Sequence, residues 1–201
     1  MSPNSNPRDA SLSLALVAMP GAGKTSVGRL LARRLGLPFV DADQEVQARV
    51  GMSIREYFEL RGEEAFRDIE QAVIAQQADG APKVLATGGG AVLRAANRDA
   101  LHRHCAVVYL RSSPEELYRR LRHDRQRPLL QVDDPLGKLR ELFRDRDPLY
   151  RSTAHFVIET GRPSVQAMAA MVLMQLELGG LLDPARVPSP VDPSVGPLPG
   201  S

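Results

Sequence analysis

Short apolar runs alternate along the chain with longer segments that have a helical pattern of apolar and polar residues. Runs of the first kind are typical of strands buried in a sheet, and segments of the second kind are typical of helices that cover one. Five runs predict strands, at residues 12–18, 38–41, 83–87, 106–110 and 155–159. The alternation of strand and helix predicts an α/β fold with a five-stranded parallel sheet flanked by helices.

Several of the predicted helices carry their own start signals. Ser53 with Glu56, and Ser113 with Glu116, have the spacing of a capping box, in which both side chains satisfy backbone N–H groups of the first turn. The apolar run at 168–178 is expected to cover one side of the sheet. The longer predicted helices span residues 24–35, 62–77, 135–146 and 164–178.

The two ends of the chain differ in composition from its middle. Residues 1–10 carry proline, serine and asparagine without an apolar pattern, and about a third of the residues from Asp183 onward are proline. We therefore expect disordered tails at 1–10 and 181–201 around one domain at 11–180. Binding of the second tail by a proline-reading partner is the alternative interpretation.

The composition indicates one globular domain in the cytoplasm. A chain of 201 residues with 43% hydrophobic content is long enough for a single core. No apolar run reaches the roughly 18 residues that span a bilayer, and no charged leader with an apolar segment opens the chain. The single cysteine, Cys105, excludes an internal disulfide and a cysteine-rich metal site, and its place before an apolar run predicts that it packs in the core.

The charged residues argue against a nucleic-acid partner. The sequence pI is about 8.9, but no dense basic run is interleaved with aromatic residues, which make up 4% of the chain. Scattered arginines fit small anionic ligands better. The only lysines are Lys24, Lys83 and Lys138, so Lys24 indicates a place where a compact ammonium fits and a planar guanidinium does not.

The stretch AMPGAGKTS, residues 18–26, has the pattern of a phosphate-binding loop and lies between a predicted strand and a predicted helix. In such a loop the backbone N–H groups point at the phosphates, and the helix dipole adds favourable potential. Lys24 is expected to bridge the β- and γ-phosphates, and the Thr25 hydroxyl to bind Mg²⁺. The residues expected to contact the nucleotide here are Gly21, Ala22, Gly23, Lys24, Thr25 and Ser26.

Ala18 stands where the usual pattern GxxxxGK[ST] has its first glycine. A side chain is excluded at that position only if the residue needs a positive φ or if a neighbour packs directly on its Cα. Position 18 ends the predicted strand, before the loop wraps the phosphates. We therefore expect an extended backbone at Ala18 and a loop that still binds phosphate.

The ends of two further strands carry candidate residues for the second substrate, because ligands of open α/β sheets bind beyond the carboxyl ends of the strands. Asp41 and Asp43 follow the second strand, where one can hold a metal-bound water and the other an acceptor hydroxyl. Two solvated turn aspartates are the alternative. The third strand ends in Gly88, Gly89 and Gly90, a backbone against which a ligand can lie flat.

With these motifs in place, the chain resembles the shikimate kinase family over residues 12–178. The segments that carry the resemblance are PGAGKT, DAD, GEEAFRDIE (62–70), TGGG (87–90), RPLL (127–130) and RDPLY (146–150). The resemblance implies the three-layer P-loop kinase fold with a mobile lid, which we place at 122–134. It also implies transfer of the γ-phosphate of ATP to the 3-hydroxyl of shikimate, in the aromatic amino-acid pathway. We expect the protein to act as a monomer.

On the nucleotide side, the resemblance places Lys24 and Thr25 on ATP and Mg²⁺, with Asp41 holding waters of the metal. Arg127 then belongs to the lid that closes over ATP, and Arg162 lies near the adenine. Lys24 and Arg127 are thus candidate catalytic residues.

On the acceptor side, the resemblance places Asp43 on the shikimate hydroxyls, as an orienting residue and a proton acceptor. Arg67 and Arg146 fall on the substrate carboxylate, and residues 88–90 line its ring. Bidentate guanidinium pairing suits a small carboxylate. Glu70 follows Arg67 by three residues on a predicted helix, so it is placed to hold that arginine.

Two other functions fit parts of the pattern. A small kinase for gluconate or for a nucleoside monophosphate shares the loop, although the paired aspartates with a triple glycine argue against it. A nucleotide-sensing module without catalysis also shares the loop, but no residue of the acceptor site is missing from this chain.

Overall fold

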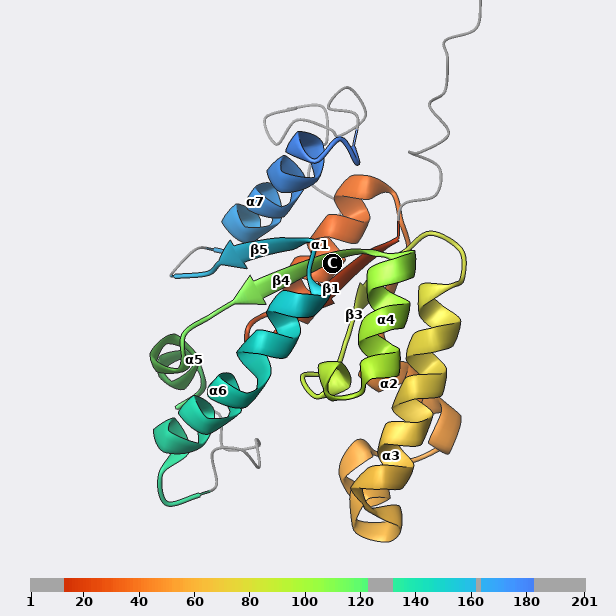
Figure 1. The fold of residues 1–201 in the computed structure, drawn as a ribbon, viewed down its shortest axis with the longest axis vertical. Coiled ribbons are helices and arrows are strands. Elements are labelled where there is room, and N and C mark those ends of the chain that lie inside the picture. The colour runs from red at the N-terminus through yellow and green to blue at the C-terminus, as the bar shows by residue number, and fades with distance from the viewer. Residues whose placement is uncertain (1–12, 123–131, 162–163, 183–201) are drawn as a thin grey trace, which may run out of the picture.

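The computed structural model describes residues 13–122, 132–161 and 164–182, and within them five strands form one parallel sheet (Figure 1). The order across the sheet is β2-β3-β1-β4-β5, and every paired strand is parallel to its neighbour. The strands are β1 Leu14–Val17, β2 Phe39–Asp41, β3 Val84–Ala86, β4 Ala106–Arg111 and β5 Phe156–Glu159. The predicted five-stranded parallel sheet is confirmed.

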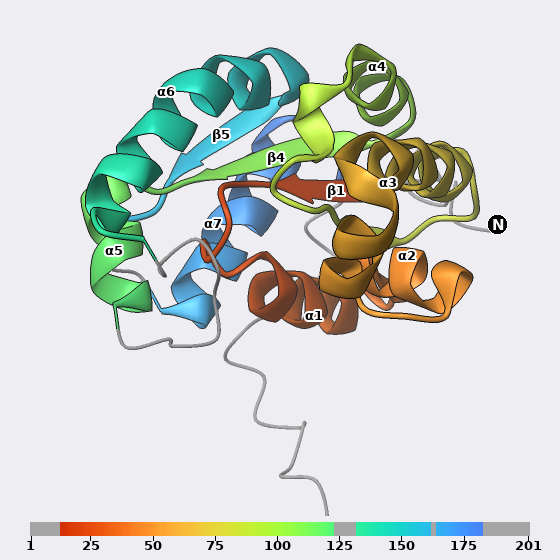
Figure 2. The ribbon, with the colours of Figure 1, turned by 90° about the horizontal axis from the view of Figure 1, so that it is seen from below.

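Helices cover both faces of this sheet, so the domain has three layers (Figure 2). α1 and α7 lie on one face, and α3, α4 and α6 lie on the other. The helices are α1 Lys24–Leu35, α2 Ala42–Val50, α3 Ile54–Ala78, α4 Ala95–His104, α5 Pro114–Leu121, α6 Pro135–Thr153 and α7 Val165–Leu178, with a 3₁₀ turn, η2, at Ala91–Leu93. In the described residues, no helix is both long and apolar enough to cross a bilayer.

Two helices have no counterpart in the prediction. α2 buries only Ala42 and Val46, and α4 buries only Asn97 and Leu101, so neither has a strong apolar stripe in the sequence. The predicted end of α6 at residue 146 is wrong, because this helix continues through Pro148 to Thr153. A proline normally ends a helix, but here the last turns are held by burial of residues beyond it.

The sequence predicts one helix that begins after Ser53 and a second helix at 62–77. The structure shows the break between them at Gly62. α3 runs across this glycine, whose φ of 81° and ψ of 172° are not helical. Residues with a side chain rarely adopt a positive φ, so the chain changes direction here at a glycine. The Ser53 hydroxyl accepts from the Glu56 N–H and the Glu56 carboxylate from the Ser53 N–H, which confirms the predicted capping box.

The core lies between the sheet and both helical layers. The four residues of β1 have no exposed surface, and Cys105 is buried with a free thiol, as expected. Burial raises the pKa of this thiol to about 11. The methionines of α7 only partly follow the prediction of a covered run, because Met168 is buried whereas Met174 is 49% exposed.

A stacked pair of histidines joins α4 to the segment before β5. The rings of His102 and His155 are nearly parallel, with centroids 4.1 Å apart, and His155 Nδ1 accepts a hydrogen bond of 3.0 Å from the Val107 N–H. Burial, and then the proximity of His102, lower the pKa of His155. The acceptor exists only while this nitrogen has no proton.

Stability is therefore expected to fall as the pH drops below the usual histidine pKa of about 6.5. The lowered folded-state pKa means that the unfolded chain takes up the proton first, which favours unfolding at acid pH. Urea unfolding between pH 7.5 and 5.5 measures this loss. In His155→Asn the side-chain carbonyl keeps an acceptor without titrating, so the loss should be smaller than in the wild type. An identical pH dependence in both proteins would refute this role of His155.

Candidate active site

The phosphate-binding loop connects β1 to α1 and is shaped by glycines. Gly21 and Gly23 have φ of 83° and 92°, and Gly23 is the N-cap of α1 without a side-chain cap. No described residue other than glycine has a positive φ, so Ala18 does not have the conformation that would require a glycine there. The Lys24 ammonium folds back along the loop and donates to the carbonyls of Ala18 (3.0 Å) and Met19 (3.3 Å). The loop therefore keeps its shape with alanine at its first position.

The second strand ends beside this loop. The Thr25 hydroxyl donates to Asp41 Oδ2 at 3.1 Å, and Asp41 Oδ1 accepts from the Asp43 N–H at 3.1 Å. Asp41 is thereby the N-cap of α2, so the chain is already helical at Ala42 and Asp43 lies in the first helical turn. Asp41 and Asp43 therefore do not alternate along a strand. Their two carboxylates nevertheless have different neighbours.

The Asp43 carboxylate has one acidic and two basic side chains near it. Its burial, and then the charge of Asp41, raise the pKa of the Asp43 carboxyl, whereas Lys24 and Arg67 act in the opposite direction. A carboxylate that is partly desolvated and close to both a lysine and an arginine is poised to accept a hydrogen bond or a proton from a hydroxyl.

Arg67 is fixed from two sides by carboxylates on its own helix. Its Nη1 donates to Glu70 Oε2 at 2.6 Å and its Nη2 to Glu63 Oε1 at 3.0 Å. The predicted Glu70 contact is therefore confirmed, and Glu70 is only 1% exposed. Burial lowers the pKa of Arg67 and raises that of Glu70, but Glu70 and Glu63 together outweigh burial for the arginine, whose pKa is raised overall. The Arg67 guanidinium therefore stays charged although its side chain is largely buried.

The triple-glycine turn brings these groups together. A Cβ on Gly88 would lie 2.6 Å from Asp43 Oδ1, and a Cβ on Gly90 would overlap the guanidinium of Arg67. The middle residue, Gly89, accepts a hydrogen bond from Arg146 Nη1 at 3.2 Å. Asp43, Arg67 and Arg146 thus approach one short stretch of bare backbone from three different helices.

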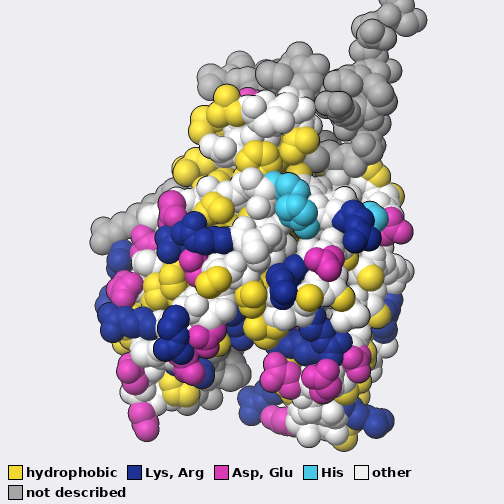
Figure 3. Space-filling view, in the orientation of Figure 1, with side chains coloured by type: hydrophobic (Ala, Val, Ile, Leu, Met, Phe, Trp, Pro, Cys, Tyr) yellow, Lys and Arg dark blue, Asp and Glu magenta, His cyan; other side chains and the backbone are white. Residues whose placement is uncertain are grey.

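A hollow of about 410 Å³ opens between the phosphate-binding loop and the ends of β2 and β3. Figure 3 shows a notch at the lower edge of the molecule, between the lobe of α5 and α6 and that of α3, with charged side chains on both walls. The residues that line the hollow are Pro20, Gly21, Gly23, Lys24, Thr25, Ser26, Asp41, Asp43, Ala86, Thr87 and Gly89. Predicted nucleotide and acceptor residues therefore share one cavity.

Comparison with known sequences assigns the chain to a family. The sequence model described as shikimate kinase matches residues 20–177.

The chain belongs to the shikimate kinase family. A shikimate kinase of Paracidovorax citrulli is 54% identical over 186 residues, which cover 91% of this chain and 100% of that protein. One from Burkholderia thailandensis is 55% identical over 175 residues, covering 87% and 95%. Family membership makes the protein an ATP-dependent small-molecule kinase of aromatic amino-acid biosynthesis.

Solved structures agree with this assignment. A shikimate kinase from Acinetobacter baumannii in complex with shikimate is 43% identical, with a TM-score of 0.79, and the match covers 87% of this chain and 97% of that one. A gluconokinase from Sinorhizobium meliloti has a TM-score of 0.51 at 18% identity, over 85% and 98%. At that identity the likeness concerns the fold alone, and it gives no support to gluconate as the acceptor.

Some of the predicted site residues are not among the described ones, and others differ from expectation. Arg127, Arg162 and most of the predicted lid at 122–134 lie outside the described residues. The Ala22 side chain is fully buried in the core, so any contact with the nucleotide comes from its backbone. The Tyr150 hydroxyl donates to the Gly89 carbonyl, a contact that the sequence does not predict although Tyr150 ends the RDPLY segment.

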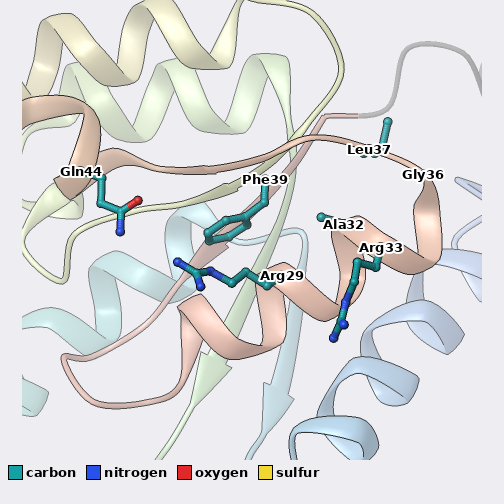
Figure 4. Close-up of a pocket in the computed structure, with 7 residues that line it drawn as sticks. All are labelled: Arg29, Ala32, Arg33, Gly36, Leu37, Phe39 and Gln44. Atoms are coloured by element: carbon teal, nitrogen blue, oxygen red, sulfur yellow. The ribbon is translucent and has the colours of Figure 1, made fainter. Parts of the chain in front are cut away.

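A larger hollow lies elsewhere among the described residues. It measures about 750 Å³, lies over α1 and β2, and shares no residue with the cavity at the phosphate-binding loop (Figure 4). The Arg29 guanidinium is 5.7 Å from the centre of the Phe39 ring there. The described residues that line this hollow include two arginines and one glutamine, whereas both predicted aspartates line the cavity at the loop.

Gly90→Ala is expected to raise the KM for shikimate by about tenfold and to leave the KM for ATP within about twofold of wild type. The backbone of Gly90 has φ −95° and ψ −3°, which alanine adopts without strain. The methyl group would instead displace the Arg67 guanidinium. Steady-state kinetics with each substrate varied in turn measure the effect. An unchanged KM for shikimate would show that the position of Arg67 does not matter for this substrate.

Proposed function

We propose that the protein transfers the γ-phosphate of ATP to the 3-hydroxyl of shikimate in the 410 Å³ hollow between the phosphate-binding loop and the triple-glycine turn. The observation that carries this proposal is the convergence of Asp43 and Arg67 on that turn, directly beside the loop. One carboxylate and one fixed guanidinium match a small polyol that carries an acid group.

The nucleotide side of the proposed site uses the loop and the first turn of α1. Backbone N–H groups at Gly21 to Ser26 face the phosphates, and the helix dipole of α1 favours their negative charge. Lys24 leaves its two carbonyl partners in the loop and contacts the transferring phosphoryl group. Arg127 and Arg162 are further proposed nucleotide contacts, on the basis of the family resemblance.

The oxygen atoms of Thr25 and Asp41 suit Mg²⁺. Their hydroxyl and carboxylate oxygens lie 3.1 Å apart at the edge of the loop, and hard oxygen ligands are the ones that this ion prefers. Mg²⁺ keeps several of its waters and takes few protein ligands, so two oxygen atoms at the loop are enough for the proposed site. Bound with ATP, Mg²⁺ would supply positive charge beside the phosphates.

The acceptor side orients shikimate. Arg67 and Arg146 bind the carboxylate, and the bare backbone at 88–90 lets the ring lie close. Asp43 accepts a hydrogen bond from the reacting hydroxyl and takes its proton as the bond to phosphorus forms. The transition state of phosphoryl transfer is loose, so this positioning contributes more than the basicity of Asp43 does.

A coupled assay of ADP release tests the proposal. The protein should turn over ATP with shikimate and not with gluconate or AMP. Shikimate at one hundred times its dissociation constant should also stabilise the fold by about 2.7 kcal/mol in a thermal shift experiment. Faster turnover with gluconate or AMP than with shikimate would overturn the proposed acceptor, and ATP binding without any turnover would favour a sensing module.

The proposed cytoplasmic location and monomeric state rest on the sequence. Light scattering during size-exclusion chromatography tests the monomer, since a dimer would elute with twice the mass of 22.0 kDa.

A further inference from the structure

Tyr150 lies on the buried face of α6, one turn after Arg146. Its side chain has no exposed surface, and its hydroxyl donates to the Gly89 carbonyl at 2.5 Å. Arg146 Nη1 donates to the same carbonyl oxygen at 3.2 Å. Residues four apart share one face of a helix, and a carbonyl oxygen has two lone pairs, so both donors can be bound at once.

A second aromatic ring packs against the Tyr150 ring and holds it in position. It stacks on Tyr109 of β4, with ring centroids 4.8 Å apart. The Tyr109 hydroxyl donates to Asp147 Oδ1 at 2.9 Å, and this carboxylate also binds Arg111 and Arg151 at 2.8 Å each. Burial raises the pKa of both tyrosines, so both hydroxyls remain protonated donors at neutral pH. The donor to Gly89 is therefore held in one place by ring stacking and by the helix that carries it.

The Gly89 peptide is the point at which the two halves of the site meet. A Cβ on Gly89 would lie 2.7 Å from Cγ of Pro20, so this residue packs directly on the phosphate-binding loop. Its neighbours Gly88 and Gly90 pack on Asp43 and Arg67 in the same close manner. A shift of the Gly89 carbonyl would move the acceptor residues relative to the loop.

We propose that Tyr150 is a positioning residue for the acceptor substrate: its hydroxyl fixes the Gly89 carbonyl, and through it the triple-glycine turn and the Arg146 guanidinium. This inference rests on the proposed function, because it assigns Arg146 and the turn to shikimate. Without the hydroxyl, Arg146 is the one side-chain donor to this carbonyl that remains among the described residues. The triple-glycine turn can then shift together with the flexible Arg146 side chain. Because Arg146 must also hold the Gly89 carbonyl, its guanidinium is less free to bind the substrate carboxylate.

The test compares Tyr150→Phe with Tyr109→Phe. Each change removes one hydroxyl from a fully buried ring in the same stacked pair, but only the first removes a donor to the turn. The carboxylate partner of Tyr109 keeps two arginines. We expect Tyr150→Phe to raise the KM for shikimate about fivefold, to leave the KM for ATP within about twofold, and to leave both KM values of Tyr109→Phe within about twofold.

A restored donor at position 150 completes the test. Replacement of Tyr150 by p-aminophenylalanine should return the KM for shikimate to within about twofold of wild type. An unchanged KM for shikimate in Tyr150→Phe would overturn the inference. So would an equal rise for both substrates, or an equal rise in both phenylalanine variants, since either would indicate a general loss of packing. A wild type that does not turn over shikimate would overturn the proposed function and this inference with it.

Discussion

Lys24→Met is expected to lower kcat by about a hundredfold or more while the protein remains folded. The ammonium offsets charge that develops on the transferring phosphoryl group, and removal of one such preorganised charge costs about 10²- to 10³-fold in rate. The same ammonium donates to the carbonyls of Ala18 and Met19, two residues with no exposed surface. Methionine has a similar length and no charge, so the surrounding packing should survive.

Lys138→Met is the matched control. The Lys138 ammonium is 2.8 Å from the Glu141 carboxylate on an exposed part of α6, so its loss should leave kcat within about twofold of wild type. Thermal unfolding of both variants separates loss of chemistry from loss of fold. If Lys24→Met kept more than about a tenth of wild-type kcat, which corresponds to less than roughly 1.4 kcal/mol, Lys24 would not act on the transition state as proposed.

Arg67→Ala is expected to have two separate effects. The KM for shikimate should rise by about ten- to a hundredfold, because a charge-assisted bond to the substrate carboxylate contributes about 1.5 to 3 kcal/mol. Stability should also fall by about 3 to 5 kcal/mol, since Glu70 would remain buried without its close cation. Kinetics with each substrate varied measure the first effect, and urea unfolding measures the second.

The double variant Arg67→Ala with Glu70→Gln separates the two effects. It removes the buried carboxylate charge together with its partner, so most of the stability should return while the KM for shikimate stays high. Arg146→Ala should raise the same KM and leave the KM for ATP nearly unchanged. A parallel recovery of stability and KM in the double variant would mean that Arg67 supports the fold and does not bind the substrate.

The strands and the phosphate-binding loop were predictable because their signals are local. A strand buried on both faces is a continuous apolar run, and the loop has fixed residue types at fixed spacing. The expected backbone of Ala18 followed from its place at the end of such a run. α2 and α4 each bury two residues, which leaves too weak a periodicity to find. α6 continues beyond its predicted end at residue 146, through Pro148, and buries Tyr150 and Thr153 there.

Contacts between distant residues could not be predicted in the same way. Tyr150 meets Gly89 across 61 positions, and Tyr109 meets Asp147 across 38. Nothing in the local sequence of either partner specifies the other, because the sheet order and the helix packing bring them together. The Arg67 and Glu70 pair was predictable because three residues along a helix place two side chains on one face.

The burial of Cys105 has a practical consequence for labelling experiments. With a thiol pKa of about 11, fewer than about one molecule in a thousand carries the reactive thiolate at pH 7.5. Because this is the only cysteine of the chain, maleimide or iodoacetamide should leave the native protein almost unmodified. A cysteine introduced at the 64% exposed position of Leu60 would then react alone, and a fluorophore there would report movement of the first part of α3 without background from the core.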